Sequence, residues 1–242
     1  MTMENSKEVF KYNSLVEKMK PFQEQWQKSM EDSLNPKQEL LDSNTQDNKQ
    51  VSSINMKHRI SNNYGLKIHH VSDTHAQQWF KMDIPTDTDV LIHSGDATNY
   101  HDLARNNNEW LDFIEWYASL PIPIKIYVPG NHDSTCYHEN KRVRKMCKDA
   151  GIEYLNKDTF SVYGLNFYGD PMTPTFGSWF FTSDRSKIGK HWDLIPEDTD
   201  VLITHGPRKG FLDLSTTGGG LNFCGDSSLG RRIDSLPNLK LH

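Results

Sequence analysis

Six residues that could bind metal ions lie in four short segments of the chain. They are Asp73 and His75 in SDTH (72–75), Asp96 in GD (95–96), Asn131 and His132 in GNHD (130–133), and His205 in THGP (204–207). Carboxylates, imidazoles and one amide, without cysteine, suit divalent ions such as Mn, Fe, Zn or Mg. Any one segment alone is a weak signal, because Asp-x-His and Gly-Asp also occur in ordinary turns.

Each segment lies at the end of a short apolar run, and these runs are residues 66–71, 89–96, 124–133 and 200–207. Four to six apolar or β-branched residues followed by polar residues, usually with a glycine, indicate buried strands. In open α/β sheets, ligands bind beyond the carboxyl ends of the strands. We therefore expect the six residues to gather at the carboxyl ends of one group of strands.

The sequence between these runs predicts an α/β fold with mixed sheets. Residues 103–120 place five large side chains on one helical face: Leu103, Trp110, Leu111, Ile114 and Tyr117. This pattern indicates a helix that crosses from one strand to the next. Alternation around Gly164 in residues 158–169 indicates an antiparallel hairpin. Residues 184–194 and 226–236 are weaker helix candidates.

Residues 1–62 read as a polar extension and residues 63–242 as the folded domain. The first glycine of the chain is Gly65, and a compact fold of several elements normally needs glycine in its turns. Residues 21–34 have apolar side chains every four residues and predict one short amphipathic helix. Three interpretations of this segment stay open: a helix that packs on the domain surface, a helix that binds a partner, and a disordered segment. Residues 41–55, rich in Asn, Gln and Ser, predict a flexible linker.

Composition excludes several classes of protein. A net charge of -5 argues against a chain held to nucleic acid by phosphate contacts. No apolar run approaches the roughly 18 residues of a membrane span, and the N-terminus has no apolar stretch like that of a secretory signal. Three cysteines form no disulfide framework and indicate a reducing compartment. We expect a cytoplasmic protein without a membrane or nucleic-acid partner, and the oligomeric state stays open.

Taken together and in this order, the four segments resemble the calcineurin-like metallophosphoesterase superfamily. The resemblance runs from Leu66 to the end of the chain. It is closest to the metallophosphoesterase domain-containing subgroup, which is similar to class III phosphodiesterases, because residues 168–181 and 191–213 resemble that subgroup around the fourth segment. The resemblance implies a four-layer α/β/β/α sandwich with mixed sheets and a centre of two divalent ions.

The resemblance also implies a role for each of the six residues. Asp73 and His75 would hold the first ion, Asn131 and His205 the second, and Asp96 would bridge both. His132 would bind no metal and would instead face the phosphate, where it stabilises charge or protonates the leaving oxygen. Asn131 would also donate a hydrogen bond to the substrate.

The implied reaction is metal-dependent hydrolysis of a small phosphate ester. The two ions would polarise the phosphoryl oxygens and make a hydroxide from bound water. The substrate is either a small phosphodiester, with a cyclic nucleotide among the candidates, or a phosphomonoester.

Two departures from the superfamily pattern leave alternatives open. The segment GDATNYHD (95–102) has no clear acidic residue to orient His132, and Asp133 and Asp102 are the two candidates. The final Gly-His-x-His motif, with two more ligands, does not appear before His242, so the domain reads as lacking its C-terminal strand. The chain is then a fragment, a naturally short and impaired protein, or a chain completed by a partner. The alternative function is a catalytically impaired or non-catalytic protein that binds a nucleotide or phosphate.

Several other residues near the motifs are open to two interpretations. His69, His70 and His93 are expected to pack within strands rather than bind metal. His101 and His138 follow the second and third motifs and could reach a substrate. Trp179 and Phe180 are expected to pack in the core more often than to stack on a base. The glycine-rich segment 215–220 predicts a flexible lid or linker.

Overall fold

The computed structural model describes residues 14, 17, 20, 24, 65–216 and 220–242. The predicted amphipathic helix and the predicted linker lie outside the described residues, Glu24 excepted. Within the described ranges, no helix combines the length and the hydropathy needed to cross a membrane.

Three of the four predicted strands lie side by side in a parallel sheet. This first sheet contains β1 (Ile68–Val71), β2 (Val90–His93), β3 (Ile124–Tyr127) and β4 (Glu153–Tyr154), in the order β1-β2-β3-β4. All three neighbouring pairs are parallel. The carboxyl ends of these strands therefore meet at the same edge of the sheet, as the sequence predicts.

The fourth predicted strand belongs to a second, mixed sheet. It contains β5 (Asp158–Val162), β6 (Leu165–Asp170) and β9 (Val201–Thr204), in the order β5-β6-β9. The predicted hairpin is confirmed, since β5 and β6 are antiparallel, while β6 and β9 are parallel. Leu241 lies beside β9, where its carbonyl accepts a hydrogen bond of 2.9 Å from the Leu202 backbone N–H.

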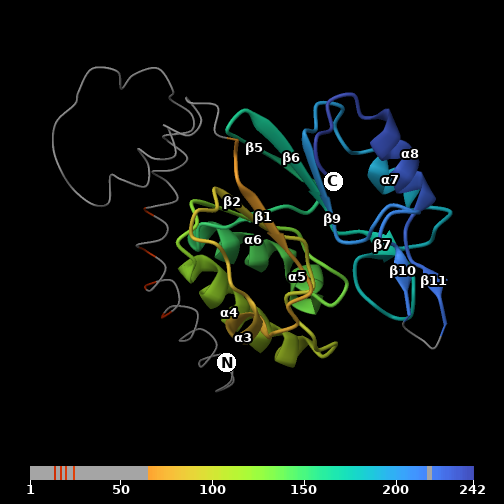
Figure 1. Ribbon diagram of the computed structural model, residues 1–242. Coiled ribbons are helices and arrows are strands. Elements are labelled where there is room, and N and C mark those ends of the chain that lie inside the picture. The colour runs from red at the N-terminus through yellow and green to blue at the C-terminus, as the bar shows by residue number, and fades with distance from the viewer. Residues whose placement is uncertain (1–13, 15–16, 18–19, 21–23, 25–64, 217–219) are drawn as a thin grey trace, which may run out of the picture.

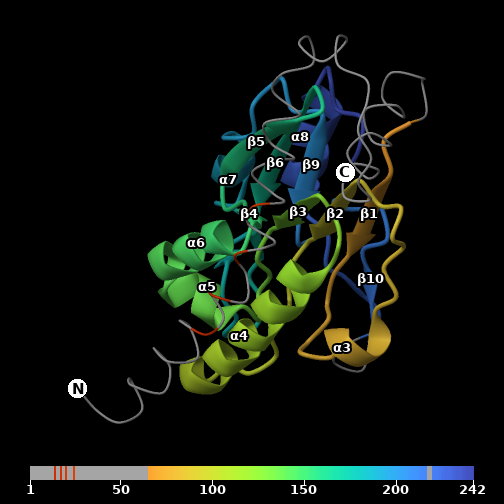
Figure 2. The ribbon, with the colours of Figure 1, turned by 90° about the vertical axis from the view of Figure 1, so that its left-hand side faces the viewer.

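The two sheets face each other across an apolar core. Its buried side chains come from both sheets, among them Val90 and Ile92 of β2 and Phe167, Val201 and Ile203 of the second sheet. Successive side chains of a strand point to opposite faces, so the residues between these contact the helices instead. In Figures 1 and 2, α4, α5 and α6 lie outside the first sheet, and α7 and α8 lie outside the second.

The helix predicted from residues 103–120 is α4 (Leu103–Ser119). Trp110, Ile114 and Tyr117 are fully buried against the first sheet, whereas Leu103, in the first turn, is exposed. The other helices are α3 (Gln78–Lys81), α5 (Ser134–His138), α6 (Asn140–Asp149), α7 (Gly189–Trp192) and α8 (Ser227–Ser235). The last two lie within the two weaker helix candidates.

Two small pairs of strands complete the described fold. β7 (Thr173–Pro174) and β8 (Thr182–Ser183) are parallel and enclose a loop that contains Trp179. β10 (Leu214–Ser215) and β11 (Asn222–Phe223) are antiparallel. Ser215 of the predicted lid is therefore part of β10, and residues 217–219 lie outside the described residues.

Candidate metal centre

The loops after β1 and β2 run side by side at the edge of the first sheet. Backbone N–H groups of Asp73 and His75 donate to the carbonyl oxygens of Gly95 and Asp96, at 2.9 and 3.0 Å. Asp73, His75 and Asp96 have φ angles of 55°, 44° and 55°. Left-handed backbone is uncommon outside glycine, costs about 1–3 kcal/mol per residue and clusters at functional sites. These loops hold three of the predicted ligands in that conformation.

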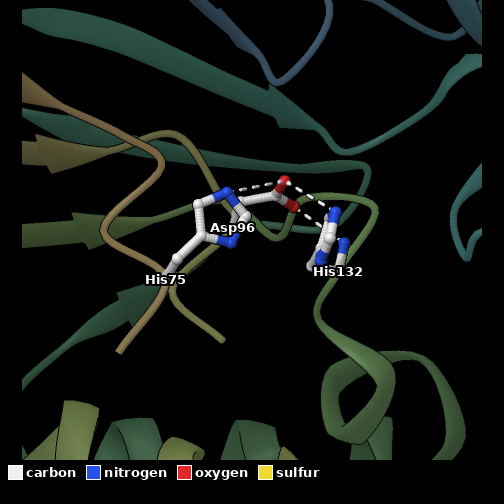
Figure 3. A group of neighbouring side chains, drawn as sticks. All are labelled: His75, Asp96 and His132. Atoms are coloured by element: carbon white, nitrogen blue, oxygen red, sulfur yellow. Dashed lines mark hydrogen bonds and ion pairs between the residues drawn. The ribbon is translucent and has the colours of Figure 1, made fainter. Parts of the chain in front are cut away.

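The Asp96 carboxylate lies at the centre of the site. Asp96 is buried, and its Oδ1 accepts a hydrogen bond of 2.7 Å from the backbone N–H of His132. Oδ1 lies 3.4 Å from Nε2 of His205, and Oδ2 lies 3.7 Å from Nε2 of His75 and 4.0 Å from Nε2 of His132. Figure 3 shows His75 and His132 on either side of this carboxylate.

The three histidines are held in the same way. Nδ1 of His75 lies 3.1 Å from the carbonyl oxygen of Thr98, Nδ1 of His132 lies 3.1 Å from that of Asn99, and Nδ1 of His205 lies 2.8 Å from that of Ser94. Because a carbonyl oxygen only accepts, each Nδ1 must carry the proton in these contacts. This arrangement directs each Nε2 toward Asp96 and is typical of metal-binding histidines.

Asn131 and Asp73 complete the set of donors. Oδ1 of Asn131, a buried side chain, lies 3.0 Å from Nε2 of His205. Oδ1 of Asp73 lies 3.9 Å from Nε2 of His75, and the Asp73 side chain is 56% exposed. The structure thus brings all six predicted residues together, five from the first sheet and His205 from the second.

Two groups of three side chains have donor atoms within 4.8 Å of one another, and Asp96 belongs to both. One group is His75, Asp96 and His132, and the other is Asp73, Asp96 and His205. This grouping differs from the implied one in where it places Asp73 and His132. Imidazole nitrogens with carboxylate and amide oxygens fit Mn, Fe or Zn, so the residues present suit divalent ions.

Asp96 and His205 each shift the pKa of the other so that the charged form of both is favoured. Burial alone would lower the pKa of His205, but the Asp96 carboxylate outweighs it and raises that pKa to about 9. Burial would raise the pKa of Asp96, but His205 holds it below its ordinary value. A proton on Nε2 of His205 occupies the lone pair that a metal ion would take, so protons and metal compete there.

Two glycines let the loops after β2 and β3 approach closely. A Cβ at Gly130 would lie 2.3 Å from Oδ1 of Asp96 and 2.8 Å from Cε1 of His205. Gly95 has a φ of +106°, and its Cβ would lie 2.5 Å from the Gly130 nitrogen. A larger residue at Gly130 would displace the central carboxylate, and one at Gly95 would push away the backbone of the loop after β3.

Neither of the two acidic residues considered as candidates to orient His132 is hydrogen-bonded to its ring. Asp133 is fully buried, and its two oxygens accept five hydrogen bonds, from N–H groups of Asp96, Thr98 and Gly130 and from the hydroxyls of Thr98 and Tyr127. Asp102 accepts from the Arg105 N–H and caps α4. Both carboxylates are therefore committed elsewhere, and the Asn99 carbonyl accepts from His132 instead.

Trp179 lies at the site and not in the core, so the expectation of core packing is wrong for this residue. Its ring stacks on His132 with ring centroids 3.8 Å apart and an angle of 28° between the planes. The loop is fixed on both sides of Trp179: the Phe180 N–H donates to the Asn131 carbonyl, and His101 Nε2 bonds the Ser178 carbonyl. His101 therefore reaches the site through this loop.

Of the remaining histidines, His93 and His70 are hydrogen-bonded, as expected for strand residues, and His138 is exposed. His93 is fully buried, Thr74 Oγ1 lies 3.1 Å from its Nε2, and burial lowers its pKa to about 3. His70 bonds the Ser94 hydroxyl. His138 packs edge-on against Phe180, at the far end of the loop that carries Trp179.

Sequence reasoning missed Asn106, a buried residue of α4. Its Nδ2 donates to the Thr98 hydroxyl and to the carbonyl oxygens of Tyr100 and His132, at 2.7 to 2.9 Å. Its Oδ1 accepts from the Thr135 N–H. The available signal was a pair of asparagines, Asn106 and Asn107, at positions that continue the buried face of α4.

Comparison with known proteins shows which proteins the chain is similar to. A family model described as calcineurin-like phosphoesterase matches residues 66–231. A UPF0046 protein of Caenorhabditis elegans is 32% identical in an alignment of 160 residues that covers 61% of this chain and 53% of that protein. Metallophosphoesterase domain-containing protein 1 of Homo sapiens is 36% identical in an alignment of 166 residues that covers 59% of this chain and 49% of that protein.

The chain spans about half the length of these curated relatives. One solved crystal structure matches with a TM-score of 0.50 and 14% identity, covering 70% of this chain and 79% of its own. At a sequence identity of 14%, this match shows a similarity of fold only.

Proposed function

Because the chain belongs to the calcineurin-like phosphoesterase family, whose activity is hydrolysis of phosphoester bonds, we propose that it cleaves a small phosphate ester with two bound divalent ions. The observation that carries this proposal is the arrangement of the three histidines. Each donates a hydrogen bond from Nδ1–H to a backbone carbonyl and directs Nε2 toward the Asp96 carboxylate. The proposed phosphoesterase domain is residues 63–242, in a four-layer α/β/β/α sandwich, and residues 1–62 are an extension to it.

The proposed ligands follow from the donor atoms at the strand ends. Asp73 and His75 would hold one ion, Asn131 and His205 the other, and Asp96 would contact both. The two ions, of Mn, Fe, Zn or Mg, would polarise the phosphoryl oxygens and lower the pKa of a water molecule.

His132 is the proposed catalytic residue among the protein's own groups. Its Nδ1 is held by the Asn99 carbonyl, its ring is supported by Trp179, and its Nε2 faces the site. In its protonated form it would donate the Nε2 proton to the leaving oxygen. Asn131 Nδ2 is proposed to donate a hydrogen bond to the phosphate.

The proposed substrate is a small phosphodiester, with cyclic nucleotides among the candidates, or a phosphomonoester. Trp179 supports an ester with a planar group, because its partly exposed ring lies beside His132.

The test measures two quantities for the protein and for its Asp96→Asn variant. One is the amount of Mn bound per chain, and the other is the rate of hydrolysis of bis-p-nitrophenyl phosphate with added Mn. Asn keeps one acceptor oxygen for the His132 N–H and removes the charge that both ions would share. We expect the variant to lose bound Mn and to fall at least about 100-fold in activity. The matched control is Asp234→Asn, an exposed carboxylate that pairs with Arg208.

Two results would contradict the proposal. One is an Asp96→Asn variant that keeps its activity. The other is a folded protein that binds a nucleotide, holds less than one ion per chain and cleaves no ester. The second result would support the non-catalytic alternative.

A further inference from the structure

A single peptide group lies between the ring of His132 and the carboxylate of Glu109. The carbonyl oxygen of Asn99 accepts the hydrogen bond from Nδ1 of His132, at 3.1 Å. The N–H of the same peptide group belongs to Tyr100, and it donates to Oε2 of Glu109 at 3.2 Å. Oε2 also accepts from the Asn99 N–H at 2.8 Å. The chain of contacts therefore runs from carboxylate to peptide to imidazole.

Such a chain makes the carbonyl a stronger acceptor. A negative charge at the N–H end of a peptide group polarises it and increases the negative charge on its oxygen. Hydrogen bonds to an ionised group are also stronger than neutral ones. The Glu109 charge thus favours the orientation of His132 in which Nδ1 carries a proton and Nε2 faces the site.

We propose that Glu109 is a positioning residue that acts on His132 through the Asn99–Tyr100 peptide group. This inference rests on the proposed function, in which His132 protonates the leaving oxygen. The peptide relay takes the place of a direct contact between a carboxylate and His132, since Asp133 and Asp102 are both bonded elsewhere.

The surroundings hold this peptide group in place. Glu109 lies on α4 three residues after Asn106, so both side chains project from neighbouring positions of one helix. Asn106 donates to the carbonyls of Tyr100 and His132 and ties the relay to the segment that carries the imidazole. Trp179 stacks on the His132 ring. A helix, a clamped loop and a stacked ring therefore fix the two ends of the relay.

The first test measures the tautomer of His132 in the metal-free protein by long-range ¹H–¹⁵N NMR, above the pH at which the ring is protonated. The protein should hold His132 with its proton on Nδ1. In Glu109→Gln the population of that tautomer should fall, because the amide carries no charge to polarise the peptide. Glu115→Gln, which makes the same charge change further along α4, is the control and should leave the tautomer unchanged.

The second test compares kcat for two phosphodiesters, one with an alkoxide leaving group and one with p-nitrophenolate. Only the alkoxide needs a proton from His132 as it leaves. Glu109→Gln should lower kcat for the alkoxide ester about fivefold, as expected when a charge-assisted hydrogen bond becomes a neutral one. Its KM, and its kcat for the p-nitrophenyl ester, should stay near those of the unchanged protein.

Two results would overturn the inference. An unchanged His132 tautomer in Glu109→Gln would show that the charge does not reach the ring. An equal loss of kcat for both esters, together with a lower melting temperature, would show a structural role for Glu109 only. If the protein cleaves no ester, the proposed function fails, and the NMR measurement still decides whether Glu109 positions His132.

Discussion

The three histidines and Asp96 at the centre of the site are held by hydrogen bonds to backbone groups. The histidine Nδ1 atoms face backbone carbonyls, and the Nε2 atoms face Asp96. Asp133 is fully buried, and its burial together with the negative charge of the neighbouring Asp96 raises its pKa. Its five hydrogen bonds join the segments that follow β2 and β3. Asp133 thus supports the candidate ligands without being one of them.

Replacing Asp133 with Asn should destabilise the fold strongly. An amide has one acceptor oxygen, and its NH₂ group would face donors such as the Gly130 N–H and the Tyr127 hydroxyl. Buried donors left without an acceptor cost about 1–3 kcal/mol each, so we expect the free energy of unfolding to fall by about 2–4 kcal/mol. Urea denaturation of the protein and the variant measures this difference.

Asp158→Asn is the matched comparison, because Asp158 forms a half-exposed pair with Arg144. A half-exposed ion pair should contribute no more than about 1 kcal/mol. Equal losses for the two variants would contradict the supporting role assigned to Asp133.

At the scale of elements, parallel pairing brings the candidate ligands together. β1, β2 and β3 end at one edge, and β9 of the second sheet ends beside them. The loops that follow can approach because Gly95 and Gly130 carry no side chain. β4, the outermost strand next to β3 in the first sheet, carries no candidate ligand but contains a carboxyl group with an unusual pKa.

That group is Glu153, whose pKa is raised from 4.5 to about 7, mainly by burial and further by Asp158. The folded state therefore holds a proton on Glu153 that the unfolded state releases above about pH 4.5. Its contribution to stability is complete below that pH and is lost as the pH rises through about 7. We expect the free energy of unfolding to fall by about 1–2 kcal/mol across this window, allowing for the partial exposure of the group.

The measurement is urea denaturation at about pH 5 and about pH 8. Glu153→Gln has no such proton, so its free energy of unfolding should change less between the two pH values than that of the protein. An identical change in both would contradict the raised pKa of Glu153.

At the scale of the whole molecule, the site depends on contact between two sheets. Five of the six candidate residues follow strands of the first sheet, and His205 follows β9 of the second. The apolar core between the sheets therefore sets the distance from His205 to Asp96 and Asn131. Phe167 is fully buried in that core.

Phe167→Ala should weaken the fold and the metal site together. Truncation of a buried phenylalanine costs about 3–5 kcal/mol, and the sheets are free to shift into the cavity left behind. We expect a lower free energy of unfolding and, in the protein that remains folded, weaker Mn binding by titration. Phe223→Ala removes an exposed ring and should change neither. Unchanged Mn affinity in folded Phe167→Ala would show that the core does not set the geometry of the site.

The sequence alone was enough to predict the four strands that lead into the site, the crossover helix, the hairpin and the clustering of six residues. Those features depend on local patterns: apolar runs that end in polar residues, helical periodicity, and the shared carboxyl edge of parallel strands. Tertiary structure alone decided which group accepts the hydrogen bond from Nδ1 of His132, what Asp133 contacts and where Trp179 lies. These outcomes depend on hydrogen bonds and ring contacts between segments far apart in the chain, such as Asn131 with Phe180 and His132 with Trp179. Local sequence patterns do not indicate which distant residues folding brings into contact, so these partners could not be predicted from the sequence.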